Sequence, residues 1–370
     1  MRNKNLIIGL SCLFILVALF SITTKSQKPE ETPLFEPILI GTGGDPHWSP
    51  DGTKLAYVYK NALYIANADG TGERVKVAEL PKWTWGFIWV DSAEFILHEF
   101  ERHRIEKKGL QEFVRIKKLT IDGKIEPIVE AQIYKDNLMT TPQITPPIVL
   151  NDGTVGYYEI PVSEGRITLE AEKIFRIIKP GKLPPDSALK QMRAISDAQV
   201  AISKIKEIRD SPMGIWLESA DGTIRKQILC KDGLNAYRNP QLSPDGTKIL
   251  GETSYRHGMW VLALDGKKLA YLDGDSKDSV VFAPGVVGWA VGVTAKWSPD
   301  SRQIVYMVSA EDGHTVLTTD LFLINADGTG KTRLTDTPDV IEAYPIWSPD
   351  GTRIAYVTDI GSKIYVMRVK

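Results

Sequence analysis

The chain has 370 residues, of which 45 are basic and 46 acidic, so the formal net charge is −1. This balance excludes an overall basic field of the kind that attracts nucleic acid. The local basic runs at 102–109 and 115–118 have glutamates within or beside them, and we interpret them as solvated strand edges.

The N-terminus predicts export. Two cations in "MRNKN" precede an uncharged apolar run over 6–22, and a polar, proline-containing stretch follows it. A positive flank before an apolar core is typical of an export signal, and 17 apolar residues reach the lower limit of a membrane span. We therefore expect an uncleaved anchor over 1–24, with a cleaved signal as the alternative, a linker over 25–35, and an exported body over 36–370. A positive N-terminal flank leaves that body periplasmic or otherwise extracytoplasmic.

The two cysteines predict a domain without disulfides. Cys12 falls in the apolar segment, so Cys230 has no partner in the exported part. Burial and closure must hold this fold together.

A pentapeptide, "WSPDG", marks an internal repeat. It occurs at 48–52 and again at 347–351, and degenerate copies lie between them at steps of 41 to 60 residues. Such a period, carried by segments with strand signals, is typical of propeller blades. The positions that we take as equivalent are Trp48, Trp89, Val149, Ile195, Leu242, Trp297 and Trp347.

Each copy predicts a four-stranded antiparallel meander, with strands A to D. An alternating apolar run follows the turn, as in "KLAYVY" (54–59), and a second run ends in Asp-Gly, as in "ALYIANADG" (62–70). In "S-P-D-G", proline presets φ for the second position of a type I turn, serine suits the first and glycine the fourth. Ser301 replaces that glycine in one copy, so a left-handed φ there would cost about 1 kcal/mol.

The ends of the chain predict how the ring closes. After Trp347 there is room for strands A, B and C but not D, while "FEPILIG" (35–41) is a strand without a blade. Pairing the two would complete the last blade and remove exposed strand edges. The fold class is therefore all-β, a propeller of four-stranded antiparallel blades closed by an N-terminal strand, with seven blades favoured and six as the alternative.

The quoted repeats "HWSPDGTKLAYV…LYIANADGTGE" and "IWSPDGTRIAYVTD…KIYVMRVK" resemble the WD-like propeller repeat of TolB-type proteins. The resemblance is specific in four copies and covers roughly 36–370. TolB itself carries a separate α/β domain ahead of its propeller, and here the repeat starts directly after the linker. The resemblance therefore implies a fold, and TolB's own role is not carried over.

The D–A and B–C loops of such meanders share one face around the central channel, so their polar and aromatic residues are the candidate ligand-binding set. Arginine beside tyrosine suits a carboxylate or a sugar, although packing at blade junctions is the alternative for each residue. The candidates are His47, Trp85, His103, Tyr237, Arg238, Tyr255, Arg256, His257, Trp289, His314 and Tyr344.

Two long insertions, at 101–113 and 179–193, are predicted as a lengthened B–C loop and an interblade connection with a helical turn. Loops of that length often carry partner contacts.

Signatures of catalysis are missing from the sequence. It has no G-x-S-x-G, no H-E-x-x-H and no Cys/His cluster, so we predict no catalytic residue, no metal and no cofactor. Four dispersed histidines meeting in the channel, as in propeller lyases, remain an alternative.

We therefore predict a membrane-tethered binding or scaffold module of the cell envelope. Its partner would be an envelope protein or a glycan, it would bind no nucleic acid, and we expect a monomer. The alternative function is a lyase or hydrolase acting on acidic oligosaccharides.

Overall fold

The computed structural model describes residues 35–105, 109–132, 143–144, 147–150, 153–160, 174–181, 192–196, 214–219, 224–230, 237–253, 259–273, 281–283, 286–311, 316–338, 340–359 and 363–370. The chain divides into two compact units, Met1–Pro33 and Leu34–Lys370, and only the second contains described residues. Among these residues all the regular secondary structure is β-strand, and every sheet is antiparallel. No described helix is long and apolar enough to cross a membrane, and the predicted anchor at 1–24 lies outside the described residues.

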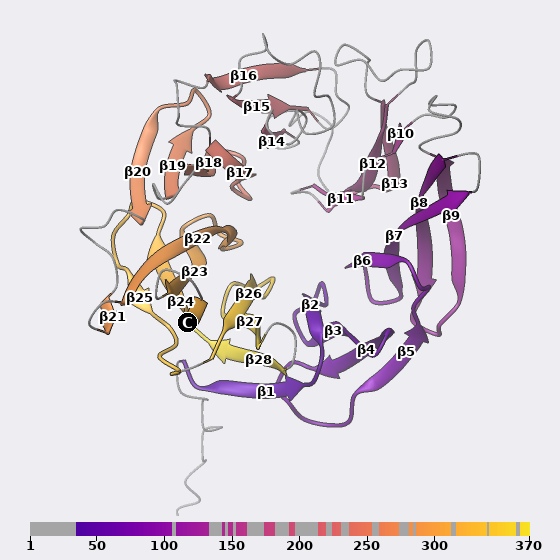
Figure 1. The fold of residues 1–370 in the computed structure, drawn as a ribbon, viewed down its shortest axis with the longest axis horizontal. Coiled ribbons are helices and arrows are strands. Elements are labelled where there is room, and N and C mark those ends of the chain that lie inside the picture. Colours follow the sequence, from indigo (N-terminus) through magenta and orange to yellow (C-terminus); the bar gives the residue numbers. More distant parts are fainter. Residues whose placement is uncertain are drawn as a thin grey trace, which may run out of the picture. The chain divides into compact units, whose positions relative to one another are not determined.

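The described strands form seven sheets that follow one another in a propeller arrangement (Figure 1). The first sheet contains β2 (Gly44–Trp48), β3 (Lys54–Tyr59), β4 (Ala62–Asn67) and β5 (Val75–Glu79). The second contains β6 (Thr84–Trp89), β7 (Glu94–Ile105), β8 (Gly109–Thr120) and β9 (Ile125–Gln132). The third contains β10 (Gln143–Ile144), β11 (Ile148–Val149), β12 (Val155–Ile160) and β13 (Ile174–Lys179), and the fourth β14 (Arg193–Ser196), β15 (Gly214–Glu218) and β16 (Arg225–Cys230).

The second half of the unit holds the remaining sheets. The fifth is β17 (Tyr237–Leu242), β18 (Lys248–Thr253), β19 (Met259–Ala263) and β20 (Lys268–Asp273). The sixth is β21 (Val281–Ala283), β22 (Val286–Trp297), β23 (Gln303–Glu311), β24 (Val316–Asn325) and β25 (Thr332–Arg333). The last has β26 (Glu342–Trp347), β27 (Arg353–Thr358), β28 (Lys363–Arg368) and, beside β28, the N-terminal β1 (Pro37–Gly41).

Six of these sheets have four or five described strands, and so six complete blades stand where the motif count favoured seven. The fourth sheet has three, because β14 pairs directly with β15. Most of the 179–193 insertion lies outside the described residues. The 101–113 insertion is predicted wrongly as a loop, since β7 and β8 continue through it as one long hairpin paired as far as Ile105 and Gly109.

The S-P-D-G copies form the same turn in four blades. In the first, the Gly52 amide donates to the Ser49 carbonyl at 2.8 Å, and the Ser49 hydroxyl donates to Asp51 at 2.6 Å. Asp51 also accepts the Thr53 amide at 2.9 Å. Because these bonds satisfy the turn locally, each copy positions the end of one strand and the start of the next.

Three tryptophans at the ends of A strands, Trp48, Trp297 and Trp347, donate to the neighbouring blade in the same way, whereas Trp89 donates to the Asp91 carbonyl of its own blade at 2.6 Å. The indole N–H of Trp297 donates to the Gln241 carbonyl at 3.3 Å, and that of Trp347 donates to the Lys296 carbonyl at 3.1 Å. In each case the acceptor residue comes immediately before the motif position of the preceding blade, which is Leu242 for Gln241 and Trp297 for Lys296. The ring also fills the wedge between blades, as predicted, and Trp347 is 8% exposed.

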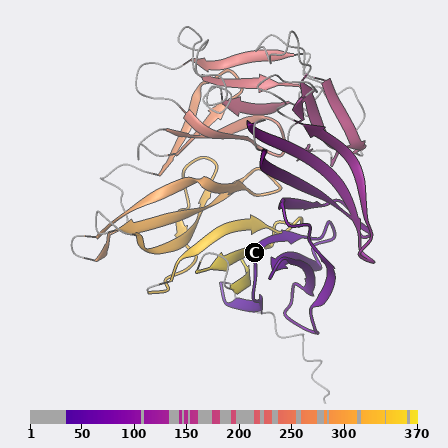
Figure 2. The ribbon, with the colours of Figure 1, turned by 45° about the vertical axis from the view of Figure 1, so that its right-hand side comes forward.

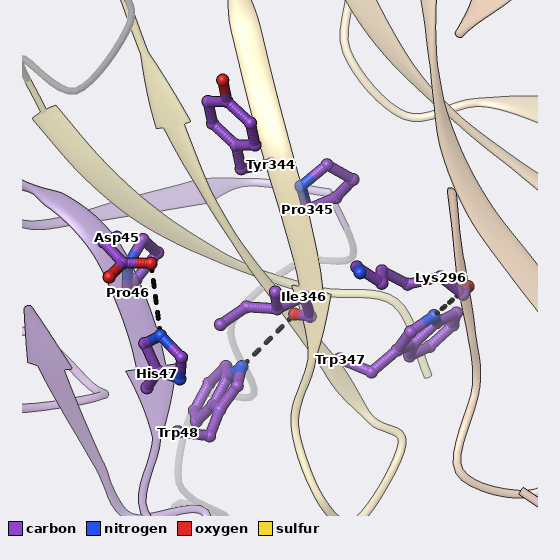
Figure 3. Close-up of a pocket in the computed structure, with 9 residues that line it drawn as sticks. All are labelled: Asp45, Pro46, His47, Trp48, Lys296, Tyr344, Pro345, Ile346 and Trp347. Atoms are coloured by element: carbon purple, nitrogen blue, oxygen red, sulfur yellow. Dashed lines mark hydrogen bonds and ion pairs between the residues drawn. The ribbon is translucent and has the colours of Figure 1, made fainter. Parts of the chain in front are cut away.

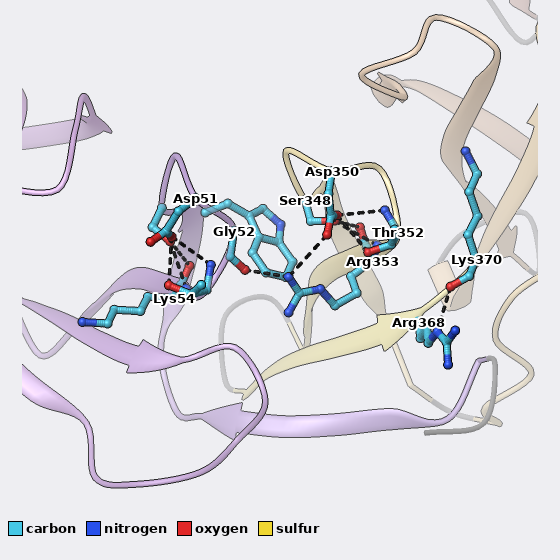
Figure 4. A network of polar contacts seen from close by, with 12 residues as sticks. Asp51, Gly52, Lys54, Ser348, Asp350, Thr352, Arg353, Arg368 and Lys370 are labelled. Atoms are coloured by element: carbon cyan, nitrogen blue, oxygen red, sulfur yellow. Dashed lines mark hydrogen bonds and ion pairs between the residues drawn. The ribbon is translucent and has the colours of Figure 1, made fainter. Parts of the chain in front are cut away.

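The first and last blades make the same contact. Trp48 donates to the Ile346 carbonyl at 3.3 Å. The Arg353 guanidinium donates to the Gly52 carbonyl at 2.7 Å (Figure 4). One apolar cluster contains buried residues of both blades, including Leu55 and Ile354. The N-terminal and C-terminal strands accordingly lie side by side in two views (Figure 1, Figure 2).

Strand β1 occupies the outer edge of the last sheet. It pairs antiparallel with β28, with Ile38 opposite Val366. The turn between β4 and β5 packs on it so closely that a Cβ at Gly70 would lie 2.7 Å from the Ile38 side chain. Between the fourth and fifth sheets, a Cβ at Gly266 would similarly lie 2.6 Å from the carbonyl of Ile228 on β16. In this packing β1 stands where other blades have their outermost strand.

Candidate functional site

A cavity of about 540 Å³ lies where the first strands of the first, sixth and last sheets approach one another. We call it the strand-A cavity. Its size falls within the range of small-molecule sites in proteins. Most of its exposed lining is apolar, and the lining residues are Asp45, Pro46, His47, Trp48, Lys296, Tyr344, Pro345, Ile346 and Trp347 (Figure 3).

Two backbone bulges shape this cavity. Pairing shifts register between Gly44 and His47 in β2, and between Ala343 and Ile346 in β26. At each bulge the residue before a proline has a left-handed backbone, with φ of 52° at Asp45 and 53° at Tyr344. Such a conformation costs about 1–2 kcal/mol for a residue other than glycine. Strain of this kind is concentrated at functional sites.

The polar groups of the cavity are few. His47 Nε2 lies 3.2 Å from Asp45 Oδ1, and the His47 ring packs on Phe87 with centroids 4.3 Å apart. The Tyr344 side chain is largely exposed. These groups come from β2 and β26, which belong to the first and last sheets.

Lys296 supplies the cation of the site. In Figure 3 its side chain runs from β22 toward β26, where Pro345 and Ile346 lie. No described residue forms an ion pair or hydrogen bond with its ammonium. The side chain keeps contact with solvent, but desolvation by the surrounding protein lowers the pKa of Lys296 below its usual value.

Of the predicted site residues whose side chains are described, the structure brings together His47 and Tyr344. Trp85 lies elsewhere on β6, 73% exposed, with its ring 5.6 Å from that of Phe100. For four candidates only the backbone is described, and four more lie outside the described residues, so all eight stay predictions. The former are His103, Tyr237, Arg238 and Trp289, and the latter are Tyr255, Arg256, His257 and His314.

Sequence reasoning missed Asp45 and Lys296. Both lie on A strands, in β2 and β22, whereas the predicted candidate set was confined to the D–A and B–C loops. A signal was available, because Lys296 and His47 occupy the position immediately before the repeated tryptophan. That position differs among the blades, with histidine, lysine and isoleucine in three of them. At Lys296 and Ile346 the backbone carbonyl accepts an indole N–H, a role that does not depend on the side chain.

A second polar group lies at the seam between the sixth and last sheets. Glu342 and Asp320 are 1% and 0% exposed, and the Arg333 guanidinium donates to Asp320 at 2.6 Å. The Thr335 hydroxyl donates to Glu342 at 3.0 Å. Burial, together with the neighbouring Asp320 carboxylate, raises the pKa of Glu342 to about 7, against opposing hydrogen bonds. Burial also raises the pKa of Asp320. We call these residues the acidic seam.

A metal site is not formed by the described part of the chain, in which no three His, Cys, Asp or Glu side chains cluster. The predicted alternative of four converging histidines involves His103, His257 and His314, whose side chains lie outside that part. It is therefore untested.

Comparison with curated proteins finds peptidases that match over short segments. Dipeptidyl-peptidase 5 of Porphyromonas gingivalis is 41% identical over 68 residues, which are 18% of this chain and 10% of that protein. The uncharacterized peptidase YuxL of Bacillus subtilis is 24% identical over 148 residues, 37% of this chain and 20% of that protein. The matches thus span a fifth of these relatives or less. No family model matches the chain.

Solved structures with a similar arrangement include a putative TolB from Agrobacterium tumefaciens, at 17% identity and a TM-score of 0.40, covering 89% of this chain and 90% of that one. An oligogalacturonate lyase in complex with manganese has 13% identity and a TM-score of 0.39, covering 88% and 76%. The tricorn protease has 12% identity and a TM-score of 0.49, covering 92% and 34%. At these identities the likeness concerns the fold.

Proposed function

We propose that this chain is an exported, membrane-tethered β-propeller that binds a partner of the cell envelope and has no chemistry of its own. The strand-A cavity carries the proposal. It combines an apolar wall, one cation without a polar partner among the described residues, and left-handed backbone conformations at Asp45 and Tyr344. Such a combination suits recognition.

We further infer that the blades form a closed TolB-like ring, in which β1 serves as the fourth strand of the last blade and the three-stranded fourth sheet belongs to a seventh blade. The tryptophan bond from Trp48 to Ile346 supports this inference because it repeats the bond between consecutive blades. The packing of Gly70 on β1 supports it in the same way. Closure matters for function, since two walls of the cavity come from opposite ends of the chain.

Binding at the cavity is tested with the purified full-length chain and a fragment library, followed by ligand-observed NMR. We expect a subset of fragments to bind and to lose affinity at least fivefold when Tyr344→Ala removes the exposed ring. Trp85→Ala, which removes an exposed ring outside the cavity, is the matched control. Equal loss in both variants, or no fragment bound, would contradict the proposal.

The location is a separate proposal. It rests on the apolar segment at 6–22 and its cationic flank. Fractionation of cells that express the full chain should recover it in carbonate-resistant membranes, with its body open to external protease after the outer layers are permeabilised. Recovery of an N-terminally shortened chain in the soluble fraction would instead indicate a cleaved signal.

The matched peptidases do not extend the proposal to proteolysis. The printed chain holds no G-x-S-x-G, and the similarity covers a minor part of each peptidase. We propose a monomer, with an envelope protein or a glycan as partner.

A further inference from the structure

We propose that the strand-A cavity recognises a carboxylate carried on an apolar body, and that Lys296 is the residue that pairs with this carboxylate. The inference rests on the proposed function, because it names the chemistry of the ligand for the same cavity.

The two charged side chains in the lining of the cavity, Asp45 and Lys296, differ in their polar contacts. The Asp45 carboxylate already faces the His47 ring at 3.2 Å, whereas the Lys296 ammonium contacts no described polar partner. A cation in a partly desolvated wall gains more from an anion than one in bulk water, since the local dielectric is lower. The lowered pKa of Lys296 reports the same desolvation and is consistent with an unpaired site.

The repeat explains why Lys296 is available. The equivalent residue of the preceding blade, Gln241, uses its side chain to donate to the Ala295 carbonyl at 2.7 Å. In the last blade the equivalent residue is Ile346, which cannot form a polar contact. Lys296 keeps the backbone role of the position, since its carbonyl accepts the Trp347 indole at 3.1 Å. Its ammonium has no part in that interblade bond.

The walls favour an apolar body. Five of the nine lining residues are proline, isoleucine or tryptophan, and Tyr344 adds an exposed ring with φ of 53°. Both indole N–H groups in the lining are occupied by carbonyls of neighbouring blades, so the tryptophans present apolar surface to the cavity. Burial of apolar ligand surface against such a wall contributes about 25 cal/mol per Å².

The anion is a carboxylate because the cavity holds one cation. A phosphate dianion is usually gathered by several donors, often an arginine cluster. Here a single lysine is available, and the Asp45 carboxylate in the same lining opposes a second negative charge. A monoanion satisfies Lys296 without that repulsion. Two sources share this chemistry, a small free acid and the C-terminal carboxylate of a peptide with an apolar last residue.

The experiment measures dissociation constants of charge-matched probes with the full-length chain. The small probes are 4-phenylbutyrate and its primary amide, and the peptide probes are acetyl-Ala-Ala-Phe with a free and with an amidated C-terminus. We expect the acid of at least one pair to bind at least tenfold more tightly than its amide. A preference within the first pair identifies a small acid as the source, and a preference confined to the second identifies a peptide end.

Variants connect the preference to one residue. Lys296→Met keeps the length of the side chain and removes its charge, so the acid and the amide should bind equally. Lys226→Met, which removes an exposed lysine of β16, should leave the preference intact. A preference that survives Lys296→Met, or acid and amide bound equally by the unmodified chain, would overturn the proposal.

The failure of the carboxylate proposal is distinguishable from the failure of the cavity itself. Equal binding of acid and amide that is lost in Tyr344→Ala retains the cavity and rejects the carboxylate. Absence of binding by all four probes at millimolar concentration rejects the carboxylate, while the fragment screen then decides whether the cavity binds anything. Circular dichroism of each variant checks that the fold is unchanged.

Discussion

The indole N–H of Trp48, in the first blade, donates a hydrogen bond to the backbone carbonyl of Ile346, in the last blade, at 3.3 Å. The bond joins residues 298 positions apart and repeats the one between Trp297 and Gln241 of consecutive blades. A seam between the two ends of the chain is therefore built like the seams within it.

Replacement of these tryptophans tests that equivalence. Trp48→Phe removes the indole donor to a partly buried carbonyl and shortens a ring packed between blades, so we expect a loss of about 1–3 kcal/mol in the free energy of unfolding. Trp297→Phe, at an internal seam, should cost about the same. Urea denaturation of both variants provides the measurement. A Trp48→Phe cost close to zero beside a normal Trp297→Phe cost would mean that the terminal seam contributes nothing and would contradict closure.

Gly70 provides a test of how β1 packs against the first blade. Its φ is +74°, and an added Cβ would meet Ile38 Cγ2 of β1 at 2.7 Å. Gly70→Ala should therefore destabilise the protein by more than the 1–2 kcal/mol of backbone strain alone. Gly153→Ala is the matched control, because its φ is +85° and its Cβ would meet no heavy atom within 4 Å.

A double variant separates strain from contact. In the background of Ile38→Ala the additional cost of Gly70→Ala should fall toward that of Gly153→Ala, because the clashing methyl is gone. The comparison uses the same urea denaturation. An unchanged cost would show that β1 does not pack on this turn in solution.

Ser301 combines a prediction that is confirmed with a contact that was not foreseen. Its φ is 60°, the left-handed value expected from its place in the turn. Its hydroxyl also accepts the backbone N–H of Asp245, in the preceding blade, at 2.9 Å. Ser301→Gly therefore relieves about 1 kcal/mol of strain but removes a bond of similar worth. We expect a melting temperature within a few degrees of the unmodified chain.

The alanine variant distinguishes the two effects. Ser301→Ala keeps the strain and loses the bond, so it should melt below both the unmodified chain and Ser301→Gly. If Ser301→Ala were as stable as the unmodified chain, the interblade bond would have no energetic role.

These residues also show how far the sequence reaches. The meander, the turn and the left-handed position of Ser301 follow from local chemistry, because Ser, Pro, Asp and Gly act on their own backbone. The bond from Asp245 to Ser301 and the cavity at Lys296 depend on which blades meet, and no local pattern encodes that geometry.

His47 and Tyr344 were found because they stand out as polar or aromatic residues beside a tryptophan turn. Lys296 was missed because a lysine within a strand is ordinarily solvated. The strands of the fourth sheet could not be defined from the sequence, because its copy of the motif is too degenerate to define a strand pair.

Binding at Lys296 should depend on pH. Because desolvation lowers the pKa of this ammonium, its charge is lost at a lower pH than that of an ordinary lysine. The other titratable groups that line the cavity are Asp45, His47 and Tyr344. The affinity for 4-phenylbutyrate should therefore decline with rising pH, and at a lower pH than the charge of an ordinary lysine would require, while the affinity for the amide stays constant. Titrations of both probes check this, and parallel declines would exclude Lys296 as the cause.

The acidic seam makes stability depend on pH with a defined sign. Glu342 has a folded pKa of about 7 against an ordinary 4.5, so the folded state holds a proton that the unfolded state releases. The contribution of Glu342 to the free energy of unfolding should therefore be largest below pH 4.5, and it should fall as pH rises from 4.5 to 7. The fall is about 3 kcal/mol at most. Asp320, whose pKa is also raised, acts in the same direction, and Arg333, Asp336 and Tyr356 are the other titratable groups around the pair.

Glu342→Gln isolates that contribution. The amide can still accept the bond from Thr335, which Glu342 accepts at 3.0 Å, but it cannot ionise. Its free energy of unfolding should vary less between pH 5 and pH 8 than that of the unmodified chain, and the variant should be the more stable of the two at pH 8. Glu73→Gln, at an exposed glutamate, controls for the loss of one carboxylate and should leave the profile unchanged. Parallel profiles for Glu342→Gln and the unmodified chain would mean that Glu342 is not a buried acid that is protonated near neutral pH.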